Sequence, residues 1–307
     1  MTGVLVLDCD PGIDDMVAIL VACTTPGYEL RAVTTVGGNA GLEATTRNAC
    51  QVLELAGRAD VPVAAGANRP LVHPATTFAE HVHGATGLGG MTLPPPRKAP
   101  EKGHAVDLLA KILEREPVTV VATGPLTNIA LLFALRPELM SNVERLVVMG
   151  GSIGRGNVSP AAEFNIWFDP EAAQRVLSTR EIATTMVGLD VTMRTTLTPE
   201  QVDQARRTGP VGAQVAAGLD FYEQRYRAML GRPVIPVHDA VAVVAATRPD
   251  LVTTKPANVT VDTGYGPSRG NTLVDFDTDG MHVAVEADKS GVLGYILERV
   301  AVASSKA

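Results

Sequence analysis

Short apolar runs rich in β-branched residues alternate with helical patterns along most of the chain. Six runs predict strands, several of them apolar on both faces: Val4–Leu7, Ala32–Val36, Val118–Ala122, Leu146–Met149, Thr184–Leu189 and His282–Val285. Helical spacing, often opened by Asp, Thr or Pro, predicts helices over Met16–Cys23, Leu42–Ala56, Val106–Leu113, Leu126–Leu135 and Pro170–Leu177. Strands that are apolar on both faces are typical of sheets with helices on each side.

This order predicts an α/β fold with a mostly parallel central sheet and helices on both faces. Ligands of such sheets bind where strands end and helices begin, so the residues after each strand are the candidates for a site. The proline-rich segment Leu93–Pro100 indicates a stiff surface loop and not a domain boundary. Residues 198–236 are more helical, and we expect them to form a cap or wall beside the sheet. We interpret residues 1–307 as a single domain.

The composition narrows the class of protein. Of the 307 residues, 46% are hydrophobic and 19% charged, which is enough apolar surface for a large globular core. A net charge of −7 without a basic stripe argues against nucleic acid as a partner, and no apolar stretch is long enough to span a membrane. The three cysteines form no C-x-x-C pair, and no basic leader precedes Asp8. We therefore expect a cytoplasmic protein without disulfides or a zinc site.

Four aspartates crowd into the eight residues after the first predicted strand: Asp8, Asp10, Asp14 and Asp15. Carboxylates held this close raise one another's pKa unless a cation neutralises them. Oxygen ligands alone favour Ca²⁺ or Mg²⁺ over zinc or copper. Each aspartate by itself could complement a helix dipole, make a turn or end a strand. Capping one helix end needs only one or two carboxylates, so the four together predict a site for a hard cation.

Polar and glycine-rich motifs also follow other predicted strands. Gly37-Gly38-Asn39 follows the second strand, Thr123–Asn128 follows the third and Gly150-Gly151 follows the fourth. Paired glycines let the backbone approach a ligand closely. Alone, each motif could be a turn or a helix cap, and Asn39 or Asn128 more often caps a helix than contacts a substrate. Their occurrence at matching strand ends favours one shared site.

Two later motifs carry groups that can act in catalysis. Glu163 and Asn165 lie two residues apart in A-E-F-N, and His238-Asp239 precedes an apolar helix. His238-Asp239 could equally be only a signal for the start of that helix. Because a cation at the aspartate cluster requires a further protein ligand, a functional role for His238-Asp239 is favoured.

These motifs occur in an order that resembles a known family. D-x-D-P-G-x-D-D at Asp8–Asp15, T-G-P-L-T-N at Thr123–Asn128, M-G-G at Met149–Gly151, A-E-F-N at Ala162–Asn165 and V-H-D-A at Val237–Ala240 follow one another as in nucleoside hydrolases of the inosine-uridine type. The resemblance spans nearly the whole chain, and its first motif is the most specific. It implies a nucleoside hydrolase-like fold and a Ca²⁺-dependent enzyme that cleaves ribonucleosides with water into ribose and free base. It also implies a homodimer or homotetramer.

The resemblance implies roles for individual residues. Asp10, Asp15 and Asp239 match calcium ligands, and Thr123 matches a residue that supplies its backbone carbonyl. Asp8 precedes these ligands, and we expect it to orient the loop without touching calcium. The positions matching contacts to the ribose are Asp14, Asn39, Glu163 and Asn165, with Met149 and Asn157 on its 5′ side. His238 matches the acid for the leaving group, and the residues expected near the base are His83, Phe164, Tyr222 and Tyr226.

The predicted residues suit a glycosidic cleavage that leaves positive charge on the sugar, because carboxylates stabilise an oxocarbenium-like transition state. We expect Asp10 to accept the proton of the attacking water, with inversion at the anomeric carbon. His238, with an ordinary pKa near neutrality, would protonate the departing base. Purines would depend on this acid most. The sequence leaves the preference between purines and pyrimidines open.

Two other interpretations fit part of the pattern. A D-x-D pair after the first strand also opens phosphatases of the haloacid dehalogenase type, in which Asp8 would be the nucleophile and Mg²⁺ the metal. The residues Pro11–Asp15 depart from the usual ending of that motif, and Thr123–Asn128 lacks an obvious phosphate-binding lysine. The second alternative is a ribose-binding or nucleoside-binding protein without catalysis, against which the presence of both Asp10 and His238 argues.

Overall fold

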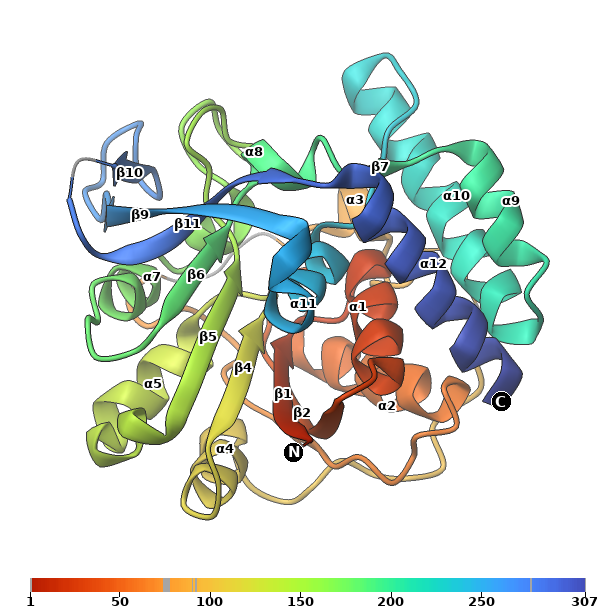
Figure 1. Ribbon diagram of the computed structural model, residues 1–307, viewed down its shortest axis with the longest axis horizontal. Helices are drawn as coiled ribbons and strands as arrows, with labels where there is room; N and C mark the ends of the chain where they lie inside the picture. Colours follow the sequence, from red (N-terminus) through yellow and green to blue (C-terminus); the bar gives the residue numbers. More distant parts are fainter. Residues whose placement is uncertain (1, 74–77, 90, 92, 277, 307) are drawn as a thin grey trace.

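A nine-stranded sheet forms the centre of the protein in a computed structural model that describes residues 2–73, 78–89, 91, 93–276 and 278–306 (Figure 1). Across the sheet the strands are β10 (Thr272–Asp275), β9 (Val252–Val261), β11 (Met281–Ala287), β6 (Thr184–Val187), β5 (Val143–Met149), β4 (Val118–Ala122), β1 (Gly3–Cys9), β2 (Tyr28–Thr35) and β3 (Val63–Ala65). The neighbours from β11 to β3 are parallel, whereas β9 runs antiparallel to β11 and to β10. The predicted mostly parallel α/β sheet is confirmed.

Helices cover both faces of this sheet. One core contains α1 (Ile13–Thr24), α2 (Leu42–Leu55), α10 (Pro210–Leu230), α11 (His238–Thr247) and α12 (Lys289–Lys306). The opposite core contains α4 (Ala105–Leu113), α5 (Thr127–Leu135) and α7 (Pro170–Leu177). In β1, Leu5 and Leu7 pack into the first core and Val6 into the second. This alternation explains why the predicted central strands are apolar on both faces.

Some strands differ from the prediction. The strand expected over Thr184–Leu189 ends at Val187, because Gly188 caps the short helix α8 (Leu189–Thr192). Strands β9 and β10 were not predicted. β9 lies near the edge of the sheet and six of its ten residues are partly or fully exposed to solvent, so polar residues and Pro256 interrupt its apolar pattern.

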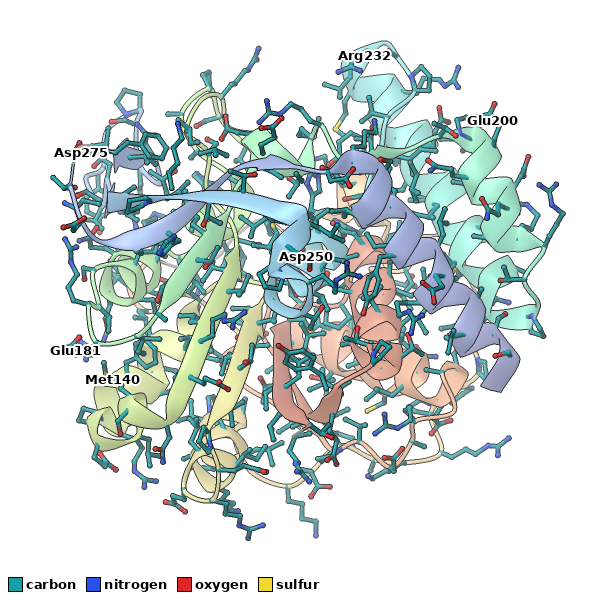
Figure 2. The ribbon with its side chains drawn as sticks, viewed as in Figure 1. Met140, Glu181, Glu200, Arg232, Asp250 and Asp275 are labelled. Carbon is teal, nitrogen blue, oxygen red and sulfur yellow. The ribbon has the colours of Figure 1, made fainter. Side chains whose placement is uncertain are left out.

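The helical stretch predicted within residues 198–236 consists of α9 (Pro199–Arg206) and α10. α10 packs against α9, α12 and α1, and forms a wall beside the end of the sheet (Figure 1). The short strand β7 (Thr196–Leu197) precedes α9 in the sequence, and β8 (Ile235–Pro236) follows α10. These two strands pair antiparallel. Arg232, just after α10, lies at the periphery of the molecule, as does the charged side chain of Glu200 in α9 (Figure 2). None of the helices in the described ranges is long and apolar enough to cross a membrane.

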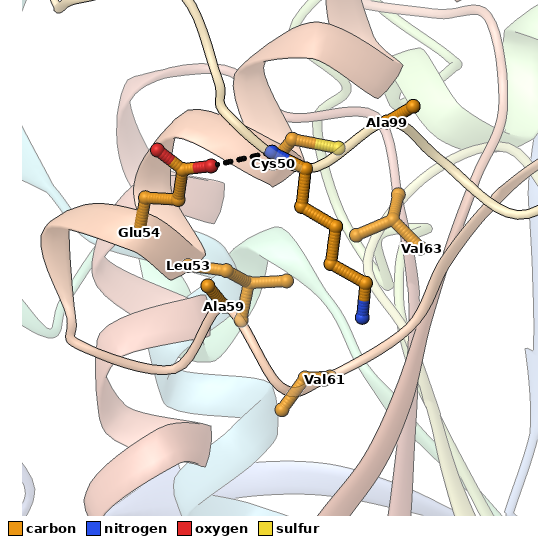
Figure 3. A pocket seen from close by; sticks show the side chains of 8 residues that line it. Cys50, Leu53, Glu54, Ala59, Val61, Val63 and Ala99 are labelled. Carbon is orange, nitrogen blue, oxygen red and sulfur yellow. Dashed lines mark hydrogen bonds between the residues drawn. The ribbon is translucent and has the colours of Figure 1, made fainter.

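The proline-rich segment from Leu93 to Pro100 has no regular structure, as predicted, and is attached to α2. The Glu54 carboxylate accepts a hydrogen bond from the Lys98 backbone at 2.9 Å (Figure 3). The Gln51 side chain donates to the carbonyls of Leu93 and Pro94 at 3.0 and 2.8 Å. These bonds hold the loop against the C-terminal part of α2.

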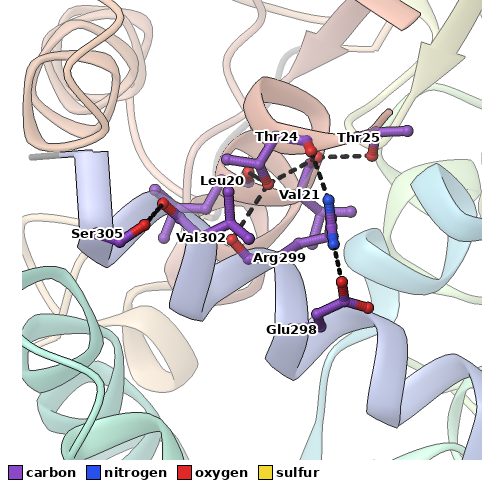
Figure 4. A network of polar contacts seen from close by, with 8 residues as sticks. All are labelled: Leu20, Val21, Thr24, Thr25, Glu298, Arg299, Val302 and Ser305. Atoms are coloured by element: carbon purple, nitrogen blue, oxygen red, sulfur yellow. Dashed lines mark hydrogen bonds and ion pairs between the residues drawn. The ribbon is translucent and has the colours of Figure 1, made fainter. Parts of the chain in front are cut away.

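The C-terminal end of α1 is fixed by a buried arginine of α12. Arg299 donates from Nη1 to the carbonyl of Thr24 at 2.9 Å and also contacts Glu298 (Figure 4). The Thr24 hydroxyl in turn donates to the Arg299 carbonyl at 3.1 Å. A cation at a helix C-terminus complements the helix dipole. α1 is therefore anchored at the end opposite to its aspartates.

Candidate active site

The predicted polar residues converge at the carboxyl ends of the parallel strands. Asp10 follows β1, Asn39 follows β2 and Thr123 follows β4, while Met149 ends β5. Asn39, Thr123 and Met149 line a cavity of about 700 Å³, whereas the predicted residues Asp10 and Asp15 are not among the described residues that line it. The predicted residues that line it are Asp14, Asn39, His83, Thr123, Met149, Asn157, Glu163, Phe164, Asn165, Tyr222, Tyr226, His238 and Asp239.

Two helices begin at this cavity with acidic first turns. Asp14 and Asp15 open α1, and Asp239 opens α11. Carboxylate oxygens of these three buried residues lie within 4.8 Å of one another. Burial and the mutual repulsion of the carboxylates raise the pKa of Asp239, and they raise the pKa of Asp14 to about 8. The positive ends of the two helix dipoles offset only part of this repulsion.

Asp10 is held beside this cluster by the loop after β2. Its Oδ2 accepts a hydrogen bond from the Asn39 backbone at 2.7 Å, and the Asn39 side chain donates to Asp15 at 3.1 Å. A Cβ on Gly38 would lie 2.1 Å from Asp10 Oδ2, so this close approach requires glycine. The glycine pair noted in the sequence thus brings the loop against the carboxylate.

The donors at this site fit a hard divalent cation. Asp10 Oδ1 and Asp14 Oδ1 are buried and have no hydrogen-bond partner among the described residues. A buried carboxylate oxygen without a donor is costly unless a cation or a proton neutralises it. The cluster offers carboxylate oxygens, which suit Ca²⁺ or Mg²⁺.

Hydrogen bonds of Thr123 join the aspartate cluster to Asn165 of the A-E-F-N motif. The Thr123 hydroxyl donates to Asp15 Oδ1 at 2.9 Å, and the Thr123 carbonyl accepts from Asn165 Nδ2 at 2.7 Å. A carbonyl oxygen has two lone pairs and can bind a second partner. The side chain of Thr123 therefore orients Asp15 while its carbonyl keeps the capacity to bind a cation.

Glu163 links the A-E-F-N motif to the M-G-G motif. Its carboxylate accepts hydrogen bonds from the backbone of Asn165 at the start of α6 (Phe164–Phe168) at 3.0 Å and from Gly151 at 3.0 Å. Burial nevertheless raises its pKa to about 7. Asn157 Oδ1 accepts from the Phe164 backbone at 2.9 Å. The A-E-F-N motif is therefore both a helix start and a lining of the cavity.

His238 lies between two helices. Its Nδ1 is 2.7 Å from the hydroxyl of Thr192 at the end of α8, and its Nε2 is 3.1 Å from the hydroxyl of Tyr226 in α10. Burial lowers the pKa of His238 from its ordinary value to about 4. The imidazole is neutral at pH 7. A neutral imidazole can still relay a proton, accepting at one nitrogen while donating from the other.

Tyr222, Tyr226 and His83 form an aromatic side of the cavity. Tyr222 and Tyr226 meet edge to face with ring centroids 4.9 Å apart, and His83 lies 5.2 Å from Tyr222. A hydrogen bond with Tyr222 lowers the pKa of Asp14, against the larger effect of burial. His83 belongs to the short helix α3 (Glu80–His83) and accepts from the Ile13 backbone at 3.1 Å. His83 therefore caps the N-terminus of α1 from a distant part of the chain.

The sequence and the fold match one known family. Residues 5–294 match the inosine-uridine preferring nucleoside hydrolases. The chain is 41% identical to the pyrimidine-specific ribonucleoside hydrolase RihA of Citrobacter koseri, over 98% of this chain and 99% of that protein. It is 42% identical to the RihA of Photobacterium profundum, over 98% and 99%. The chain belongs to this nucleoside hydrolase family.

Solved structures of the family agree with this fold. The purine-preferring ribonucleoside hydrolase from Gardnerella vaginalis superposes with a TM-score of 0.94 at 33% identity, over 99% of this chain and 100% of that one. The family and these relatives support ribonucleoside hydrolase activity. The family resemblance inferred from the motifs is confirmed.

Membership of this family removes the phosphatase alternative, and the geometry of Asp8 agrees. Asp8 is fully buried in β1 and its Oδ1 accepts from Thr34 and Asn128 at 2.6 and 2.8 Å. Burial raises its pKa to about 6. Asn128, expected as a helix cap or a substrate contact, instead holds Asp8 beneath the site.

Sequence reasoning missed two contacts of the site. His83 as the cap of α1 and Thr192 as the partner of His238 each depend on residues that are far apart in the chain. The threonine lies just after a predicted strand end, which is the one local signal that could have drawn attention to it.

Proposed function

We propose that this nucleoside hydrolase requires Ca²⁺ to cleave the N-glycosidic bond of ribonucleosides into ribose and free base. The observation that carries the proposal is the cluster of buried carboxylates of Asp14, Asp15 and Asp239, with Asp10 beside it. Asp10 and Asp14 each present an oxygen without a hydrogen-bond partner in the described part of the chain. An enclosed site of this charge requires a cation before it can be stable with its carboxylates ionised.

Asp10, Asp15, Asp239 and the carbonyl of Thr123 would hold the ion. Bound Ca²⁺ supplies positive charge that orients ribose hydroxyls and acidifies water. Asp14 shares the cluster with Asp15 and Asp239, and it also lines the cavity. It is therefore placed to contact a ribose hydroxyl beside the ion.

The protein's own residues bind the ribose and move protons. Asp14, Asn39, Glu163 and Asn165 would bind the ribose, with Met149 and Asn157 at its 5′ side, and their carboxylates favour the positive charge that develops on the sugar. Asp10 Oδ1, which has no described partner, would accept the proton of the attacking water, with inversion at the anomeric carbon. His238 would deliver a proton to the leaving base, through its contact with Tyr226.

The decisive experiment measures hydrolysis of inosine, adenosine, uridine and cytidine after removal of divalent ions with a chelator and after addition of Ca²⁺ or Mg²⁺. We expect ribose release only with added ion, and faster with Ca²⁺. Full activity in the chelated protein would remove the metal requirement, and absence of ribose release from all four nucleosides would remove the proposed reaction.

The cellular location and the assembly are separate proposals. Cys9, Cys23 and Cys50 are free thiols, which supports a reducing compartment such as the cytoplasm. A homodimer or homotetramer is proposed from the family resemblance, and light scattering of the eluted protein measures this assembly directly.

A further inference from the structure

The loop of residues 152–162, between β5 and α6, brings an arginine to the cavity beside α8 (Figure 1). Arg155 is the only lysine or arginine among the described residues that line this cavity. Its side chain is exposed and makes no ion pair or hydrogen bond within the described ranges of the chain. A guanidinium in this state is available for an anionic group on a ligand.

The backbone before Arg155 is held by α8. The Asp190 carboxylate accepts hydrogen bonds from the backbone of Ile153 at 2.5 Å and from the backbone of Gly154 at 3.2 Å. Arg155 therefore follows a segment whose position is set by two bonds to one carboxylate.

The backbone after Arg155 is held in a tight turn. The N–H of Asn157 donates to the Ala162 carbonyl at 3.1 Å. A Cβ on Gly156 would lie 2.1 Å from the same carbonyl oxygen, so this close approach requires glycine. Because the chain is held on both sides of Arg155, less conformational entropy is lost when a ligand binds to its side chain.

We propose that Arg155 binds the 5′-phosphate of nucleoside 5′-monophosphates and that the enzyme cleaves these nucleotides as well as nucleosides. The inference rests on the proposed function, in which Met149 and Asn157 lie on the 5′ side of the ribose. Arg155 precedes Asn157 by two residues, and the Asn157 side chain is fixed by its bond to the Phe164 backbone at 2.9 Å. A group attached to the 5′ oxygen is therefore directed toward the loop that carries Arg155.

Phosphate is the anion that suits this arginine best. The planar guanidinium can donate to two phosphate oxygens at once through charge-assisted hydrogen bonds. Because Arg155 is exposed, the phosphate keeps part of its hydration and avoids the full cost of burying a charge. The Asp190 carboxylate also lines the cavity, but its two backbone hydrogen bonds offset part of its repulsion toward the phosphate.

The reaction on a nucleotide is the same as on a nucleoside. Water adds to the anomeric carbon and loses a proton to Asp10, the bond from that carbon to the base nitrogen breaks, and the base leaves with a proton. The products are ribose 5-phosphate and free base. The phosphate ester at the other end of the ribose stays intact, so Arg155 contributes to binding and moves no proton.

The test measures kcat/KM of the Ca²⁺-loaded enzyme for uridine and inosine and for their 5′-monophosphates, with the sugar product identified by mass spectrometry. In Arg155→Gln the ratio of kcat/KM for the monophosphate to kcat/KM for the nucleoside should fall about 10- to 100-fold, because charge-assisted hydrogen bonds to the phosphate are lost.

The matched control is Arg115→Gln, which removes the same charge from another place. Arg115 is an exposed arginine between α4 and β4, and it is not among the described residues that line the cavity. The ratio should stay unchanged in this variant. Thermal unfolding of both variants verifies that their folds are intact.

Each outcome decides the proposal. Ribose 5-phosphate as the product, with a lower ratio in Arg155→Gln alone, supports it. Cleavage of nucleosides without cleavage of their monophosphates would overturn it, as would an equal ratio in the two arginine variants. Ribose and inorganic phosphate in place of ribose 5-phosphate would also overturn it, since the phosphate would then be removed first. Failure to cleave any nucleoside or monophosphate would instead overturn the proposed function.

Discussion

At the scale of single residues, the unpaired oxygen of Asp10 is the feature with the clearest chemical consequence. Its Oδ2 is used by the Asn39 backbone at 2.7 Å, so Oδ1 is the atom left for a proton or a cation. In Asp10→Asn an amide oxygen can replace one carboxylate oxygen, but the amide cannot accept a proton from water. We expect turnover to fall about 10³-fold while Ca²⁺ affinity changes much less, as measured by steady-state rates and calcium titration.

The matched control for this variant is Asp8→Asn, which changes a buried carboxylate two residues earlier whose Oδ1 accepts hydrogen bonds from the Thr34 and Asn128 side chains. It should keep most of the turnover. Near-normal turnover in Asp10→Asn would show that Asp10 is not the base.

His238 gives a second prediction at this scale. Because its pKa is lowered to about 4, it acts as a neutral relay at pH 7 and not as a stored proton. His238→Ala should reduce inosine cleavage by about 10²-fold and leave cleavage of p-nitrophenyl riboside nearly unchanged, since that leaving group needs no proton. His81→Ala serves as the control, because His81 is another histidine that lines the same cavity. Equal losses on both substrates would exclude His238 from the acid role.

At the scale of elements, the start of α1 depends on a contact from a different helix. His83 of α3 accepts from the Ile13 backbone at 3.1 Å and so satisfies one of the free N–H groups of α1. His83→Ala should lower the free energy of unfolding by about 1 kcal/mol. It should also weaken Ca²⁺ binding, because Asp14 and Asp15 lie in the first turn of that helix. Chemical denaturation and calcium titration measure the two effects.

His81→Ala on the same short helix is the matched control, since His81 is exposed and makes no cap to α1. A His83→Ala variant with unaltered stability and calcium affinity would contradict the capping role.

Element prediction from the sequence succeeded where local patterns carry the information. β1 and β4 are buried on both faces, so their continuous apolar runs identify them. β9 shows the opposite case, because its partly exposed residues and Pro256 resemble a loop until it pairs with β11. The pairing of distant strands is a property of the sheet and is absent from the local pattern.

At the scale of the whole molecule, the buried carboxylates couple stability to pH. The pKa values of Asp14 and Glu163 are raised to about 8 and about 7, from 3.8 and 4.5. The folded protein thus binds more protons than the unfolded chain at neutral pH, and its free energy of unfolding must fall as the pH rises. His83 and His238 act in the opposite sense, but only up to their ordinary value of 6.5. We expect chelated protein to lose stability between pH 6.5 and pH 8.

Thermal melting in chelator and in Ca²⁺ across this pH range measures the effect. Added Ca²⁺ should raise the melting temperature, and more at pH 8 than at pH 6.5, because the ion binds ionised carboxylates. Glu163→Gln should reduce the slope in chelator by removing one titrating group. A melting temperature that rises from pH 6.5 to 8 in chelator would contradict the prediction.

The sequence by itself determined the alternation of strands and helices, the aspartate cluster at Asp8–Asp15 and the order of motifs that identifies the family. These features are local, because side-chain periodicity and residue spacing persist without any long-range contact. Only the tertiary structure brought Asp239 to within 4.8 Å of Asp14 and Asp15, set His83 on α1 and placed His238 between α8 and α10. It also decided the protonation of these groups, because a pKa in a buried site depends on desolvation and on neighbours that only folding assembles.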